Sequence, residues 1–471
     1  MTDTFRLSDY QIQIGKENVI ERQLQGLLGD DPESSENQDK AKKALKEVLK
    51  EVRVRFGTIL KTDNVSFLVG AGASLSAGGV SLANIPKPLE KMLLDKAKEE
   101  QQAKNLPGWI ALFYEVASVL AQNNFTFDSR YELFQSIKEE DIPTVELNLE
   151  AFLSQLHAWF AGMLEVTEKL KLIGNSEMTI VKSDLSRLIK EITVSLTVLL
   201  NLPKSDLEAH LQSHRKFIKK VLTRPLNLRR ASLFTLNYDT LIEQAADAEG
   251  AVLVDGFIGT LRRVFRPESY DIDFYFPAQT TEGRVHRFDR ALHLYKLHGS
   301  ITWHRCEPNW ENPFGLYATF YNQDCHSDDV MIYPSPLKYS QALGMPYSEL
   351  FRRFGNVIAQ PQSALFVVGY GFGDDHVNAL IRQALAIPSF TLIVVDPDPK
   401  SDFVSRLEKL GDERVWIVKG WGLGTFDQFV ANLLPDLREE EIEAKVIKTF
   451  KNLSLPSRRA SDGLEEDSDG E

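Results

Sequence analysis

The sequence has few cysteines and no long uncharged apolar run. Its 471 residues include only Cys306 and Cys325, too few for a disulfide framework, which fits a reducing cytoplasm. The most apolar stretch, residues 192–202, is shorter than the roughly 20 residues that cross a bilayer. The opening residues lack the basic-then-apolar pattern of a signal peptide. We therefore expect a cytoplasmic protein that is not bound to a membrane.

An excess of basic charge is also missing. The chain has 54 Lys and Arg residues against 67 Asp and Glu, a formal net charge of −13. Neutralising nucleic-acid phosphates needs a basic face, so this balance argues against direct nucleic-acid binding. The length allows a large core and predicts about two to four structural units.

A glycine-rich segment follows the first strongly apolar run. Residues 65–69 (Val-Ser-Phe-Leu-Val) predict a buried strand, and residues 70–74 (Gly-Ala-Gly-Ala-Ser) predict a turn with almost no side-chain bulk. A pyrophosphate could approach the backbone N–H groups of such a turn and the start of a following helix. The segment lacks the Gly-Lys-Ser/Thr ending of a P-loop. By itself it is equally well explained as an ordinary strand-to-helix turn.

Polar side chains follow two further apolar runs. Residues 232–236 lead into Asn237 and Asp239, and residues 294–297 lead into His298. Parallel strands present ligands at their carboxyl ends, so these side chains and Gly70 could meet in one pocket. The alternative for each is structural. Asn237 and Asp239 could cap a helix that begins near residue 240, and His298 could be a buried, hydrogen-bonded histidine.

The remaining pattern predicts an α/β protein with a Rossmann-like parallel sheet. Residues 364–368, 391–395 and 415–418 are apolar throughout and are separated by helical segments, as in a sheet covered on both faces. Between the glycine turn and Asn237 the apolar spacing predicts helices over 89–98, 109–122, 147–172, 178–202 and 207–222. One helix suffices for a crossover, so this segment indicates a large helical insertion.

These patterns divide the chain into five parts. The polar C-terminal end has too little apolar surface to fold. The expected parts are an N-terminal helical extension (1–60), a Rossmann domain (61–83 and 231–430), a helical insertion (84–230), a C-terminal helix (431–454) and a disordered acidic tail (455–471).

Taken in order, four motifs resemble the sirtuin-like proteins of bacterial antiphage systems. They are Val-Gly-Ala-Gly-Ala-Ser (69–74), Thr-Leu-Asn-Tyr-Asp (235–239), Leu-His-Gly-Ser (297–300) and Gly-Tyr-Gly-Phe-Gly-Asp-Asp-His (369–376). The ordered set makes the resemblance specific, whereas each motif alone is weak. Gly371 stands where that family usually has Ser, and Val80 stands near its usual Pro.

The resemblance implies an NAD glycohydrolase that takes NAD as its substrate. We expect no metal, because His304, Cys306, Cys325 and His326 are too irregularly spaced for zinc ligands. It implies that Asn237 and Asp239 hold the nicotinamide-side ribose and the attacking water, with His298 as general base. The remaining implied NAD-binding residues are, for the pyrophosphate, Gly70, Ala71, Gly72, Ala73 and Ser74, and, for the adenosine side, Gly369, Gly371, Phe372 and Asp396.

The same resemblance implies a homo-oligomer that pairs with a HerA-type ATPase and depletes NAD when a trigger releases it. Two other functions stay open. A protein deacylase is disfavoured because the chain has no paired Cys-x-x-Cys motifs for a zinc module. An NAD or ADP-ribose sensor or scaffold without turnover would use the same pocket.

Overall fold

The computed structural model describes residues 6–28, 38–80, 84–101, 106–120, 125–138, 141–143, 149–163, 169–172, 178–202, 207–276, 286–319, 345–439 and 442. The expected acidic tail, 455–471, lies outside the described residues. Most of the expected C-terminal helix (431–454) also lies outside them; of its described residues, 431–433, 437–439 and 442 are helical. No helix among the described residues is long and apolar enough to span a bilayer.

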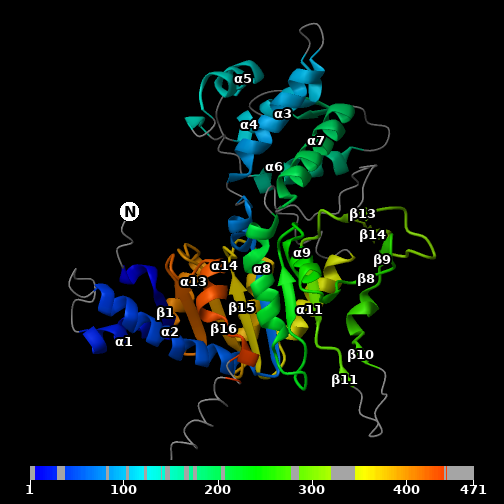
Figure 1. Cartoon of the computed structure of the whole chain (residues 1–471). Coiled ribbons are helices and arrows are strands. Elements are labelled where there is room, and N and C mark those ends of the chain that lie inside the picture. The colour runs from blue at the N-terminus through cyan, green and yellow to red at the C-terminus, as the bar shows by residue number, and fades with distance from the viewer. Residues whose placement is uncertain are drawn as a thin grey trace, which may run out of the picture.

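The main sheet and the helices that cover it form the lower part of the molecule in Figure 1. This sheet has nine strands, in the order β2-β1-β17-β16-β15-β3-β6-β12-β7. From β17 to β7 every neighbouring pair is parallel. This confirms the predicted α/β class and each predicted strand. The parallel strands are β3 (Asn64–Val69), β6 (Ser232–Thr235), β7 (Val252–Val254), β12 (Ala291–Lys296), β15 (Ser363–Val368), β16 (Thr391–Val395) and β17 (Val415–Lys419).

The strand order reverses between β3 and β15. After β3 the chain builds β6, β7 and β12 on one side, then returns to β15 on the other side. In open α/β sheets a ligand crevice forms at such a switch point, beyond the carboxyl ends of the strands. The register pairs Val69 with Val368, so the turns that follow these strands, at Gly70 and Gly369, start side by side.

Helices cover both faces of the sheet because its central strands are apolar on both sides. On one face Phe67 and Phe366 stack with their ring centroids 4.9 Å apart and pack into a core with α2, α8, α9 and η6. The other face packs against α11, α12 and α13. The bounds are α2 (Gln38–Leu60), α8 (Leu207–Leu222), α9 (Leu241–Ala248), η6 (Phe429–Leu433), α11 (Tyr347–Ile358), α12 (Asp375–Leu385) and α13 (Asp402–Leu410).

We predicted a helical N-terminal extension, but the structure shows that it also contains two strands. Strand β1 (Gln11–Ile14) pairs antiparallel with β17 and extends the sheet, and β2 (Glu17–Asn18) pairs with β1. Helices α1 (Val19–Leu28) and α2 then follow. The reason is visible in the alternation Gln-Ile-Gln-Ile, which has the period of a strand and buries Ile12 completely.

The insertion forms a unit with its own apolar core, which lies above the sheet in Figure 1. Its elements are α3 (Pro86–Glu100), α4 (Gly108–Leu120), α5 (Phe127–Ser136), α6 (Leu149–Gly162), β4 (Lys169–Leu172), β5 (Met178–Val181) and α7 (Lys182–Leu200). The β4–β5 hairpin replaces the end of the helix expected over 147–172 and the start of the one expected over 178–202.

Helix α8, which the expected boundary at residue 230 put in the insertion, packs on the sheet instead. The rings of Phe217 and Phe67 meet edge to face at 5.1 Å. The insertion therefore ends before α8, because the apolar residues of α8, Phe217 and Ile218 among them, belong to the same core as Phe67 of β3.

A small antiparallel sheet, in the order β13-β14-β9-β8, packs beside α11 and the end of β12. The minor elements of the described chain are η1 (Leu7–Asp9), η2 (Ala71–Ala77), β8 (Phe257–Ile258), β9 (Arg263–Phe265), η5 (Pro267–Asp271), β10 (Tyr275–Phe276), β11 (His286–Arg287), β13 (Trp303–Arg305), β14 (Leu316–Ala318) and α14 (Phe426–Gln428).

The glycines at the switch point bring two backbones into contact. The segment after Gly70 is itself the 3-10 helix η2, and not a loop followed by a helix. The Gly72 N–H donates to the Gly369 carbonyl at 2.8 Å, and a Cβ on Gly72 would lie 2.7 Å from Gly369 Cα. Gly369 also has a φ of +65°, which favours glycine. Both glycines are therefore needed for this contact.

We expect Gly72→Ala to lower the free energy of unfolding by about 1–3 kcal/mol, because the added methyl must push two backbones apart. Urea denaturation measures the change. Gly371→Ala is the matched control, since nothing lies within 4 Å of its Cβ position, and it should change stability by less than about 0.5 kcal/mol. Equal effects of the two substitutions would contradict this account of the turn.

Candidate functional site

A cavity of about 270 Å³ lies at the switch point, close to the lower end of the range for small-molecule sites. Its floor is made by the turns that follow β3, β6, β12 and β15. Its opposite wall is aliphatic and comes mostly from the insertion. The aliphatic lining consists of Val80, Ile85, Leu149, Leu153, Leu196, Leu200, Leu202 and Leu236.

The structure brings most of the predicted site residues together around this cavity. Asn237 and His298, which are 61 positions apart in the numbering, both line it. Gly72 and Ala73 lie in the same turn but face away from the cavity, against Gly369 and the core. The other predicted residues that line it are Gly70, Ala71, Ser74, Asp239, Gly369 and Gly371.

Phe372 and Asp396 do not line the cavity. The Phe372 ring is buried and stacks on Phe403 at 5.2 Å, and its carbonyl accepts from Asn378 Nδ2 at 2.9 Å. Its φ of +55° lets the ring turn into the core, so Phe372 anchors the glycine-rich turn. Asp396 ends the neighbouring strand β16 and accepts from the Asp398 N–H at 2.9 Å. Burial raises the pKa of Asp396.

Asn237 is held by the glycine turn. Its Nδ2 donates to the Gly70 carbonyl at 3.0 Å and to Ser74 Oγ at 2.9 Å. Because a carbonyl only accepts, this pair of contacts fixes which end of the amide carries the nitrogen. The other polar atom of the side chain, Oδ1, is an acceptor suited to a water molecule or a ribose hydroxyl.

Asp239 shapes the turn that leads into α9 and also lines the cavity. Its Oδ1 accepts from the N–H of Leu241, the first residue of α9, at 3.1 Å, which is an Asx turn; the expected helix cap is not formed, because the N-cap residue is Thr240. Its Oδ2 accepts from Ser74 Oγ at 2.6 Å. The carboxylate therefore ties η2 to α9 and aligns Ser74 for its contact with Asn237.

His298 pairs with a carboxylate that the sequence did not single out. His298 Nε2 lies 3.1 Å from Asp374 Oδ2, and both side chains are buried. Asp374 also lines the cavity and caps α12. The sequence carries a signal for the cap, an aspartate before a helical pattern. It carries none for the histidine, which is 76 residues away.

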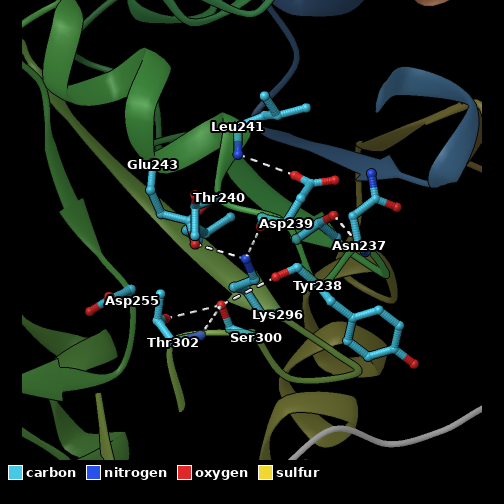
Figure 2. Close-up of polar contacts among 12 residues, drawn as sticks. Asn237, Tyr238, Asp239, Thr240, Leu241, Glu243, Asp255, Lys296, Ser300 and Thr302 are labelled. Atoms are coloured by element: carbon cyan, nitrogen blue, oxygen red, sulfur yellow. Dashed lines mark hydrogen bonds and ion pairs between the residues drawn. The ribbon is translucent and has the colours of Figure 1, made fainter. Parts of the chain in front are cut away.

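A buried ion pair, Lys296 with Glu243, lies next to the segment of Tyr238 and Asp239 (Figure 2). Lys296, at the end of β12, donates to the backbone carbonyl of Asp239 and to Glu243 Oε1, the latter at 2.8 Å. Burial raises the pKa of Glu243, and the Lys296 ammonium opposes that rise. Next to it, the Ile301 N–H donates to the Tyr238 carbonyl at 3.1 Å. The backbone carbonyls of residues 238 and 239 are therefore bound to the segment after β12 and to the last residue of β12, respectively.

We expect Lys296→Met to lower the free energy of unfolding by about 3–5 kcal/mol, because it leaves the Glu243 carboxyl buried without its cation. Denaturant unfolding followed by circular dichroism measures this. The double variant Lys296→Met, Glu243→Leu removes both charges and should recover most of the loss. A double variant as unstable as the single one would show that the pair is not the stabilising element.

His214 of α8 is a buried histidine that interacts electrostatically with Asp239. It is 2% exposed, and its ring packs on Phe426 at 4.6 Å. Burial lowers the pKa of His214, against the opposing charges of Asp239 and Asp427. A folded-state pKa below the unfolded value of about 6.5 means that the folded state disfavours the proton.

Stability should therefore be fully present above pH 6.5 and fall as the pH drops through and below that value. We expect His214→Phe to show a shallower fall in unfolding free energy between pH 7 and pH 5 than the unmodified protein. Urea titrations at several pH values measure both slopes. Burial also lowers the pKa of His293, which contributes equally to both proteins, so identical slopes would contradict the assignment to His214.

Among the described residues, no group of three or more His, Cys, Asp and Glu side chains is arranged to hold a metal ion. The site that fold and geometry define is a small-molecule cavity at the switch point of a parallel sheet. It is built from backbone turns, an amide and a histidine–carboxylate pair.

Part of the chain matches a known family. Residues 231–413 match the model of the SIR2-like domain. The matched range holds β6 to β16 and both Asn237 and His298. Strand β3 and the glycine turn that follows it precede the matched range in sequence, and β3 belongs to the same sheet. No curated protein gives a significant match to the chain.

The chain also resembles solved structures of Sir2 homologues. One is a SIR2 homologue in complex with NAD, with 12% identity, coverage of 82% of this chain and 94% of the other, and a TM-score of 0.34. A Sir2 homologue mutant with 2′-O-acetyl-ADP-ribose has 12% identity, coverage of 82% and 96%, and a TM-score of 0.34. Another mutant with ADP-ribose has 12% identity, coverage of 77% and 95%, and a TM-score of 0.30.

Proposed function

We propose that the cavity binds NAD and that the protein hydrolyses its nicotinamide–ribose bond, releasing nicotinamide and ADP-ribose. One observation carries this proposal: Asn237, His298 and the glycine turns at Gly70 and Gly369 converge on one cavity at the switch point. The SIR2-like domain match supports NAD as the ligand. The cavity size suits the nicotinamide riboside end of the molecule, with the rest lying along the turns.

The chemistry fits the residues present. The bond between ribose C1′ and the nicotinamide nitrogen breaks, and its electron pair goes to the ring, so that neutral nicotinamide leaves without needing a proton. Positive charge then develops on the ribose, and water attacks C1′. Asn237 Oδ1 accepts a hydrogen bond from that water, and His298 accepts its proton. The proton then passes to solvent.

The two halves of the cavity have different tasks in this proposal. The turn at residues 70–74 carries little side-chain bulk, and Gly369, Gly371 and Gly373 line the cavity from the second turn, so the phosphates can approach backbone N–H groups. The leucines of α6 and α7 cover the opposite side and limit the access of bulk water. With less water, the polar groups of the floor act more strongly on the developing charge.

We further propose that this activity serves antiphage defence, in a homo-oligomer paired with a HerA-type ATPase. The ordered motif set at residues 69–74, 235–239, 297–300 and 369–376 supports this biological setting. Unrestrained hydrolysis of NAD would harm the host cell, so a partner that restrains or triggers the reaction fits the proposal.

The test is nicotinamide release from NAD, measured by chromatography on the purified full-length protein with and without the ATPase. Asn237→Ala and His298→Ala should each reduce the rate by about 10²–10⁴-fold, because each removes a group that handles the attacking water. His286→Ala, an exposed histidine of β11, is the matched control and should leave the rate unchanged.

Three outcomes would contradict the proposal. Binding of NAD without cleavage under every partner condition would identify a sensor or scaffold. Nicotinamide release that requires an acyl-lysine peptide would identify a deacylase. Full activity of both site variants would show that another site does the chemistry.

A further inference from the structure

We infer that Asp374 is a positioning residue that fixes the tautomer of His298, so that the basic ring nitrogen is Nδ1. The inference rests on the proposed function, because it specifies how the base of that reaction is prepared. It starts from the distance of 3.1 Å between Asp374 Oδ2 and His298 Nε2. Each residue is only 6% exposed, so little water competes for this contact.

The carboxylate is held in place by α12. Its other oxygen, Oδ1, accepts from the N–H groups of His376 at 2.9 Å and Val377 at 3.3 Å. The backbone N–H of Asp374 donates to Tyr370 Oη at 2.9 Å. Rotation of the carboxylate away from His298 would break the helix cap, so Oδ2 has one stable position.

This geometry determines where the ring carries its proton. An ionised carboxylate only accepts hydrogen bonds, so Nε2 must donate. In a neutral imidazole the second nitrogen then has the lone pair, and this assigns the basic atom to Nδ1. When His298 takes a proton from water it becomes positively charged, and the adjacent buried carboxylate stabilises that charge.

Helix capping alone does not require an aspartate at this position. Three other described helices are capped by hydroxyl side chains: α5 by Thr126, α13 by Ser401 and α14 by Thr425. A hydroxyl offers one oxygen, which is enough for the cap. Asp374 supplies a second oxygen, and that oxygen is the one that contacts His298.

The decisive variant is Asp374→Asn. Asparagine also caps helices well, and its amide oxygen would accept from His376 and Val377. Its NH₂ group would then face His298, where it only donates. Nε2 would have to accept, the proton would move to Nδ1, and the proposed base would be blocked. We expect kcat for NAD hydrolysis to fall by about 10²–10⁴-fold, with KM changed less than about threefold.

Two further variants separate positioning from structure. Asp374→Ser keeps a capping oxygen but loses the contact with His298. It should therefore keep the thermal stability of the unmodified protein, and its kcat should be as low as that of Asp374→Asn. Asp375→Asn removes the same charge one residue later, at an exposed position, and should hydrolyse NAD within about twofold of the unmodified protein. A kcat for Asp374→Ser equal to that of the unmodified protein would overturn the inference.

Nitrogen-15 NMR of the histidine rings tests the same point without turnover. The signal of His298 is the one that His298→Ala loses. In the unmodified protein this signal should be that of the Nε2–H tautomer, and in Asp374→Asn it should be that of the Nδ1–H tautomer. A Nδ1–H tautomer in the unmodified protein, or full activity of a folded Asp374→Asn, would overturn the inference. Absence of NAD hydrolysis by the unmodified protein would instead refute the proposed function, and the tautomer would still be measured.

Discussion

The site depends on a backbone contact between the turns that follow two neighbouring parallel strands. The Gly72 N–H bonds to the Gly369 carbonyl, and neither residue has space for a Cβ. Because β3 and β15 run in register up to this point, the contact brings their turns together where the strand order reverses. Every polar group of the cavity floor is positioned relative to this pair of turns.

From that contact a chain of hydrogen bonds runs through the floor. Gly70 and Ser74 hold the Asn237 amide, Ser74 bonds to Asp239, and Lys296 bonds to the Asp239 backbone. Each bond joins two elements that are distant in sequence. The amide, the hydroxyl and the carboxylate are therefore oriented before any ligand arrives, which is the condition under which fixed dipoles stabilise a developing charge.

The sequence predicted the parts of this site that depend on local pattern. Apolar runs located the parallel strands, and residues at their ends were correctly expected to share one sheet edge. Contacts set by tertiary packing could not be predicted in this way. The pairing of His298 with Asp374 joins two turns across the sheet, and Lys296 is a single charge in an apolar run. Phe372 belongs to a glycine-rich motif, yet its left-handed backbone turns the ring into the core.

The floor and the cover of the cavity belong to two separately packed units. The floor is continuous with the two cores of the sheet, whereas the covering leucines of α6 and α7 belong to the core of the insertion. A buried ion pair between Arg130 and Glu90, with oxygen–nitrogen distances of 2.6–2.7 Å, joins α5 to α3 inside that unit. The insertion therefore keeps its shape through contacts that do not involve the sheet. It follows that the shape of the cover and the geometry of the histidine–carboxylate pair are set by different interactions.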